Sequence, residues 1–163
     1  MVEAFRHHTW ATKELLRFCR GLSTDQLGTA ATGTYGNILD TFNHFVRSHG
    51  WYLRGPAGDA PDWALHREEP RDLDRLEEWA DDAGARWERF LAEPFDGERR
   101  LLLDEGRYEC HAGVVVAQAL HHGNAHREQI CAILTGLGMQ PPDVQVWAYA
   151  QATGRGRDRT ATT

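Results

Sequence analysis

Two histidines spaced four residues apart, His122 and His126, are the residues of this chain best placed to do chemistry. On a helix, side chains at this spacing lie one above the other, with Cβ atoms about 5–6 Å apart. Two imidazoles in that arrangement can bind one metal ion at about 2.0–2.1 Å each. The spacing therefore predicts either a pair of metal ligands or a pair of structural histidines.

The pair lies within the apolar stripe of its helix. At about 100° per residue, both histidines fall in the middle of the inward-facing positions, which are Val115, Ala119, Ile130, Ile133 and Leu137. A buried polar group needs a partner, because leaving water without one costs free energy. A metal ion is one such partner, although without further context a structural role is the commoner one for such a pair.

A catalytic metal commonly takes three protein ligands and leaves a position for water or substrate. The segment 37–54 offers two candidates for the third ligand, His44 and His49. His49 falls within the apolar stripe of its predicted helix, beside Phe45 and Val46, whereas His44 lies on nearly the opposite side. The helical wheel alone therefore favours His49.

Four long helical patterns must position these histidines. Apolar residues recur at helical spacing over about 2–22, 37–54, 72–93 and 112–137, and Gly or Pro marks the end of each pattern. A Gly-, Pro- and Asp-rich segment up to about residue 71 predicts a long irregular connection, and apolar residues around a central glycine predict a β-hairpin over 98–111. The expected fold is an all-α four-helix bundle with a long crossover connection and a short β-hairpin before the last long helix. Such bundles often hold metal sites between facing helices.

The chain has 163 residues, which suits one compact domain with its own core. We expect this domain to span residues 1–154, with Trp147 and Tyr149 packed onto the bundle through a short helix. Residues 155–163 are too polar to pack and are expected to form a disordered tail.

Composition narrows the setting. The net charge of −6 argues against a nucleic-acid surface, because phosphate binding needs clustered cations. The three cysteines are far apart in sequence and odd in number, which is typical of free thiols in a reducing compartment. No apolar run has the length of a membrane span, and the first residues lack the apolar core of a signal peptide. We therefore expect a cytoplasmic protein that acts on a small molecule and binds neither nucleic acid nor membrane.

The segment from His122 to Ile130 reads HGNAHREQI and is similar to the His-x-x-x-His-Arg-Gly-Gln-Ile pattern of the DinB-like family, a damage-inducible, YfiT-type group of bacterial proteins. A second segment, from Thr41 to Leu53, resembles a segment of the family in which a ligand histidine is followed five positions later by an acidic residue. That family segment ends with an aromatic residue and a leucine. This register implies that His44 is the ligand and places His49 in the acidic position. The tail from Leu137 to Tyr149 is also similar to that group.

Two positions depart from the family pattern. Glu128 stands where the family usually has glycine, which would alter packing beside the site. His49 stands where the family has an acid, which would let it compete as a ligand or add a fourth.

The resemblance implies a DinB/YfiT-type bundle that often dimerises. It also implies a three-histidine site, formed by His44, His122 and His126, for a divalent ion such as zinc, nickel, iron or manganese. Some relatives are S-transferases that use the thiols bacillithiol or mycothiol, and one related branch isomerises maleylpyruvate with a thiol cofactor. The implied function is a metal-dependent transfer of a low-molecular-weight thiol to small electrophiles. The alternatives are a metal-dependent hydrolase at the same site, or a non-catalytic stress-response module that binds a metal or small ligand.

Two residues are placed to orient the imidazoles by accepting their free N–H protons. Asp40 lies one turn before His44, and Gln129 lies three residues after His126. Three other histidines are expected on the solvent side or in loops, and these are His7, His8 and His66.

Overall fold

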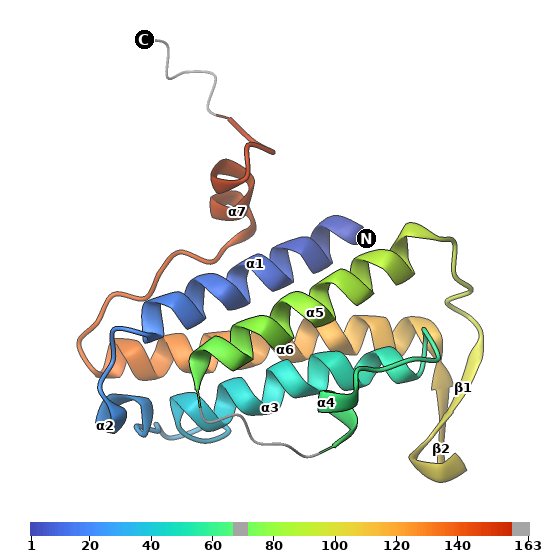
Figure 1. The fold of residues 1–163 in the computed structure, drawn as a ribbon, viewed down its shortest axis with the longest axis horizontal. Coiled ribbons are helices and arrows are strands. Elements are labelled where there is room, and N and C mark those ends of the chain that lie inside the picture. The colour runs from blue at the N-terminus through green and yellow to red at the C-terminus, as the bar shows by residue number, and fades with distance from the viewer. Residues whose placement is uncertain (67–71, 158–163) are drawn as a thin grey trace.

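The structure is a computed structural model that describes residues 1–66 and 72–157. Four long helices run along the molecule (Figure 1): α1 (Val2–Cys19), α3 (Ile38–Trp51), α5 (Leu73–Ala92) and α6 (Ala112–Gly136). The shorter helical elements are α2 (Thr24–Leu27), the 3-10 helix η1 (Tyr52–Arg54), α4 (Asp62–Leu65) and α7 (Val146–Ala152). Strands β1 (Arg100–Leu103) and β2 (Tyr108–His111) pair antiparallel across the 3-10 turn η2 (Asp104–Gly106). The predicted helical bundle with a hairpin before the last long helix is confirmed.

The four long helices pack around a shared core as two antiparallel pairs. α1 lies antiparallel to α5 and α3 lies antiparallel to α6, so that the hairpin sits at the end where α3 stops and α6 begins (Figure 1). The main core cluster includes residues from all four helices, among them Leu15, Phe42, Phe45, Leu76, Trp79, Ile130 and Leu134. No helix in the described ranges is long and apolar enough to cross a membrane.

Side chains and one glycine fix the ends of the helices that carry the site. The Asn37 side chain caps α3 by accepting a hydrogen bond from the backbone N–H of Asp40 at 2.8 Å. At the end of α6, Gly138 has a φ of +77°, a value that glycine adopts without strain. The N–H of Met139 donates to the carbonyl of Leu134 at 3.0 Å, which completes the glycine-terminated cap expected there.

The long connection between α3 and α5 is less irregular than its composition predicts. It contains α4, whose Trp63 stacks on Trp79 of α5 with 4.7 Å between ring centroids. The Trp63 indole N–H also donates to Asp82 at 2.9 Å. These contacts attach the crossover to α5, while its final part, residues 67–71, lies outside the described residues.

The C-terminal segment packs differently from its prediction. Tyr149 is buried against α1 as expected and donates a hydrogen bond to Glu3 at 2.9 Å. The expectation for Trp147 is wrong, because its side chain is 78% exposed on the outer face of α7. Arg155, which the sequence places in an unpacked tail, instead forms an ion pair with Glu3 at 3.0 Å. The tail prediction for residues 158–163 lies outside the described part of the chain.

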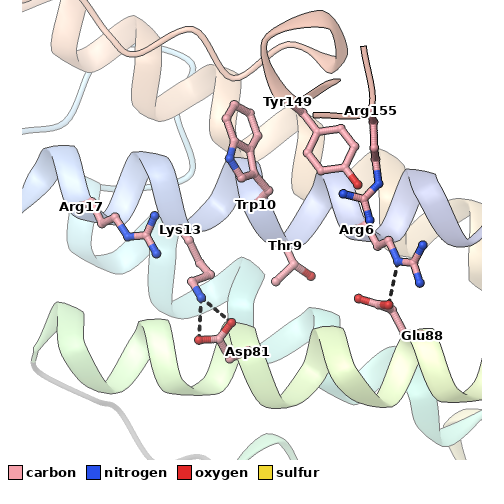
Figure 2. Close-up of a pocket in the computed structure, with 9 residues that line it drawn as sticks. All are labelled: Arg6, Thr9, Trp10, Lys13, Arg17, Asp81, Glu88, Tyr149 and Arg155. Atoms are coloured by element: carbon pink, nitrogen blue, oxygen red, sulfur yellow. Dashed lines mark hydrogen bonds and ion pairs between the residues drawn. The ribbon is translucent and has the colours of Figure 1, made fainter. Parts of the chain in front are cut away.

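A charged hollow of about 420 Å³ lies between α1, α5 and the end of α7 (Figure 2). Its charges pair across the two long helices, Lys13 with Asp81 at 2.6 Å and Arg6 with Glu88 at 2.8 Å. Solvent-accessible pairs of this kind contribute little stability each. They nevertheless leave these side chains already partnered, so we do not place the functional site here.

Helices α1 and α6 approach each other closely at Gly123. A Cβ atom at this position would overlap the imidazole of His8, whose Nδ1 would lie only 2.8 Å away. Glycine inside a helix costs about 0.5–1 kcal/mol relative to alanine, so its presence here reflects the lack of space. Gly136, at the other end of the same helix, has open space where a Cβ atom would lie, with no other atom within 4 Å.

We expect Gly123→Ala to lower the free energy of unfolding by about 1–3 kcal/mol, because the added methyl group overpacks the contact with His8. Gly136→Ala is the matched control and should leave stability unchanged or raise it by up to about 1 kcal/mol. Urea denaturation followed by circular dichroism measures both. Equal stability of the two variants would contradict the close packing of α1 on α6.

Candidate metal centre

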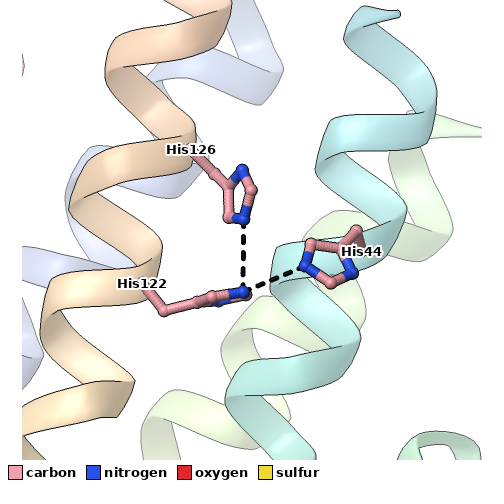
Figure 3. A group of neighbouring side chains, drawn as sticks. All are labelled: His44, His122 and His126. Atoms are coloured by element: carbon pink, nitrogen blue, oxygen red, sulfur yellow. Dashed lines mark hydrogen bonds between the residues drawn. The ribbon is translucent and has the colours of Figure 1, made fainter. Parts of the chain in front are cut away.

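Three histidines from two antiparallel helices converge at one point (Figure 3). His122 and His126 lie one turn apart on α6, and His44 reaches them from α3. The Nε2 atom of His122 lies 3.0 Å from Nε2 of His44 and 3.2 Å from Nε2 of His126. All three potential ligand atoms lie within 4.8 Å of one another. Two nitrogens bound to one tetrahedral ion at about 2.0–2.1 Å would lie about 3.3–3.4 Å apart, close to the shorter two separations.

The protonation of His126 follows from its partner Gln129. The side-chain oxygen of Gln129 accepts a hydrogen bond from the backbone N–H of Tyr35 at 3.0 Å, and the same oxygen lies 2.9 Å from Nδ1 of His126. An amide oxygen only accepts hydrogen bonds. Nδ1 of His126 must therefore carry the proton, and Nε2 presents its lone pair to the other two histidines.

The three Nε2 atoms cannot satisfy one another with protons alone. Nε2 of His126 is an acceptor, so the contact with His122 requires a proton on Nε2 of His122. That single proton cannot also point at His44, which leaves the second short contact without a good hydrogen bond. A cation bound by all three lone pairs removes this conflict, so the residues present fit a metal ion.

Burial keeps His44 and His122 in the form that a metal ion would require. Loss of hydration, with a smaller contribution from the neighbouring His126, lowers the pKa of His44 to about 4. The same two causes, in the same order, lower the pKa of His122 to about 4. Both imidazoles are therefore neutral at pH 7 and have a lone pair available for coordination.

Two tyrosines that the sequence analysis did not single out form the walls of the site. Tyr35, from the glycine-flanked loop before α3, stacks on His44 with ring centroids 3.9 Å apart. Tyr52 of η1 lies edge-on to His122 with 5.6 Å between centroids. The only sequence signal for Tyr35 is an aromatic residue between two loop glycines. A loop has no helical period, so the sequence does not indicate where this side chain points.

The helical wheel chose the wrong histidine of α3 for this cluster. His49 is only 4% exposed, but it lies among Phe5, His8 and Trp87 rather than with the two histidines of α6. α3 packs against both α5 and α6, so a side chain that lies off its apolar stripe can still face a neighbouring helix. His44 is such a side chain, whereas His49 lies within the stripe, which faces the core.

A second polar cluster lies beneath the site, around Arg127. Its guanidinium is buried and donates to Thr12 Oγ1 at 3.1 Å, to Asn124 and to His8 Nδ1 at 3.3 Å. His8 is 3% exposed, so the expectation that it faces solvent is wrong. His8 stacks on His49 at 3.9 Å, and burial followed by the charge of Arg127 lowers the pKa of His49 to about 3. These two histidines are neutral core residues.

The two candidates for orienting the imidazoles behave differently. Gln129 binds His126 as expected, but Asp40 is exposed and makes no hydrogen bond to His44 among the described residues.

Glu128, at the position where the family pattern has glycine, is exposed and does not pack into the site. His7 is half-buried, and its Nε2 lies 2.8 Å from the carbonyl of Val144, while His66 is exposed as expected.

The model of the DinB family matches residues 1–160. Because the match covers nearly the whole chain, the protein belongs to the DinB family. The resemblance expected from the HGNAHREQI segment and the α3 segment is thereby confirmed. A comparison with curated proteins finds no match.

We expect Gln129→Ala to weaken divalent-metal binding by about 10–100-fold, because the His126 ring loses the acceptor that sets its tautomer and orientation. Asp40→Ala, the matched control one turn from His44, should leave affinity within about twofold. Competition titration of zinc against a chromophoric chelator gives both values. Equal losses in the two variants would show that Gln129 has no special role.

Proposed function

We propose that the protein is a divalent-metal-dependent enzyme that transfers a low-molecular-weight thiol to a small electrophile. The convergence of three imidazole nitrogens at 3.0 and 3.2 Å, with one tautomer set by Gln129, carries this proposal. His44, His122 and His126 would hold the ion, which would be zinc, nickel, iron or manganese. Three neutral ligands leave the net charge of the ion uncompensated and leave a position for an exogenous ligand.

A divalent ion bound there would lower the pKa of a thiol or water that it binds, because the cation stabilises the anion. The protein's own contribution is orientation and partial exclusion of water. Gln129 holds the His126 ring with its lone pair toward the centre, and Tyr35 covers the His44 ring. Tyr52 borders the opposite side beside His122 and is hydrogen-bonded by Gln118 at 3.4 Å.

The nucleophile in this proposal is an external thiol. Burial raises the pKa of Cys19 to about 12 and that of Cys131 to about 11, so neither thiol is appreciably ionised at neutral pH. Bacillithiol or mycothiol, the thiols used by some relatives, would supply the sulfur instead. Its sulfur forms a bond to the electrophilic carbon as the bond to the leaving group breaks. The leaving group takes the electron pair and the thiol proton passes to solvent.

We place the reaction in the cytoplasm, with a small-molecule substrate and without nucleic acid or membrane. The net charge of −6 and the three unpaired cysteines support this setting. A homodimer remains a prediction from the family resemblance. The exposed side chains of Val146 and Trp147 on α7 would offer apolar surface for it.

The test is thiol conjugation by the zinc- or nickel-loaded protein, with 1-chloro-2,4-dinitrobenzene as electrophile and bacillithiol or mycothiol as donor. We expect thioether formation only with metal, loss of activity to background in His126→Ala, and full activity in His121→Ala. His121 is the matched control because it is exposed beside His122.

Two results would contradict thiol transfer. Hydrolysis of a nitrophenyl ester without any thiol would assign the site to a hydrolase. Stoichiometric metal with neither activity would point to a binding module.

A further inference from the structure

At one end of the bundle α3 stops, α6 begins and the hairpin folds alongside them (Figure 1). A cavity of about 510 Å³ lies there. Its walls come from η1 and the residues on either side of it, from β1 and the hairpin turn that follows it, and from Val115 in the first turn of α6. Arg99 holds two of these walls together. Its guanidinium donates to the carbonyls of Gly55 and Pro56 at 3.3 and 2.6 Å and so connects the chain after η1 to the hairpin. The cavity is therefore held in shape by the fold itself.

The cavity adjoins the three-histidine site through Tyr52. This side chain lines the cavity and also lies 5.6 Å from His122, measured between ring centroids. Val115, on the cavity wall, precedes His122 by two helical turns, a distance of about 10 Å along the helix axis. A molecule of about that length would reach from the cavity to the histidines.

The walls combine an apolar surface with one guanidinium that has no partner among the described residues. Leu101 and Val115 are 8% and 6% exposed and face the cavity together with Trp51. Arg107 is already engaged at the hairpin turn, where it donates to the carbonyl of Asp104 at 3.1 Å and pairs with Glu105 at 3.8 Å. Arg54 makes no hydrogen bond or ion pair with any residue in the described ranges.

Two arginines without an ion-pair partner among the described residues lie between the histidines and the cavity. Arg47 lies one turn after His44 and two turns before Arg54 on the same side of α3 and η1, and it likewise has no ion-pair partner in the part of the chain that the structure describes. The cavity lining itself is balanced in charge, because Arg54 and Arg107 face it together with Asp104 and Glu105 of the exposed turn, and Arg107 already pairs with Glu105.

We propose that this cavity binds the body of a carboxylate-bearing small molecule whose other end faces the three histidines. Arg54 binds the carboxylate, for which a planar guanidinium is well matched. Trp51, Leu101 and Val115 contact a hydrocarbon or aromatic body. The assignment of this molecule as the substrate or thiol donor rests on the proposed function, whereas its binding in the cavity does not require the metal.

Three probes of matched shape test the proposal: 3-phenylpropionate, the neutral 3-phenylpropionamide and the cationic 3-phenylpropylamine. Their affinities are measured by NMR titration of the ¹⁵N-labelled protein, both metal-free and zinc-loaded. Because Arg54 is exposed, we expect the carboxylate to bind the wild type about threefold more tightly than the amide, the effect of one solvent-accessible ion pair, and the amine to bind most weakly. The shifted resonances should include Trp51 and Val115.

Arg54→Gln should remove the preference for the carboxylate over the amide. The matched control is Arg89→Gln, because Arg89 is an exposed arginine of α5 with no described partner, and it should keep the preference. Asp104→Asn should strengthen carboxylate binding, since it removes a repelling charge. Asparagine also tolerates the positive φ of 50° at this position.

The proposal is overturned if the wild type binds the carboxylate and the amide equally, or if Arg54→Gln keeps the full preference for the carboxylate. Either result in a protein that still binds zinc would leave the proposed function standing. Loss of zinc binding with the carboxylate preference intact would instead overturn the proposed function and keep the cavity assignment.

Discussion

The packing of α3 against α6 is the constraint on which the rest of the structure depends. Helical spacing alone brings His122 and His126 together, but the third nitrogen must arrive across an interface and stop 3.0 Å from Nε2 of His122. Helix α1 contacts both of these helices, because Gly123 lets the His8 ring lie directly against α6 and the same ring stacks on His49 of α3 at 3.9 Å. A small displacement of α6 would separate the nitrogens, so packing and chemistry are controlled by the same contacts.

Burial and a neighbouring charge together keep His49 neutral. Arg127 enters the core with hydrogen bonds to neutral acceptors, Thr12, Asn124 and His8, and without a salt bridge among the described residues. An imidazolium at His49 would lose its hydration and would also be repelled by that guanidinium, which lowers the pKa of His49, and the neutral ring stacks on His8. His49 is therefore a neutral core residue that lies outside the three-histidine cluster.

Much of the fold could be predicted because long helices repeat their apolar residues every three to four positions, and the ends of α3 and α6 have recognisable caps. The direction of His44 could not be derived in this way. A helical wheel locates the centre of one apolar stripe, but α3 packs against two helices. Only the register of the family resemblance therefore identified His44. Trp147 was misplaced because α7 is too short to show a period, and Tyr35 was missed because its loop has none. Side chains that close a site from loops depend on tertiary contacts that spacing does not encode.

The most direct test of the account is the metal content of the untagged, zinc-reconstituted protein in the wild type, His44→Ala and His49→Ala, with folding of each variant checked by circular dichroism. We predict about one ion per chain in the wild type and in His49→Ala. His44→Ala should retain little or no zinc, because it removes the only ligand from α3. Metal that is lost in His49→Ala and kept in His44→Ala would contradict the site described here.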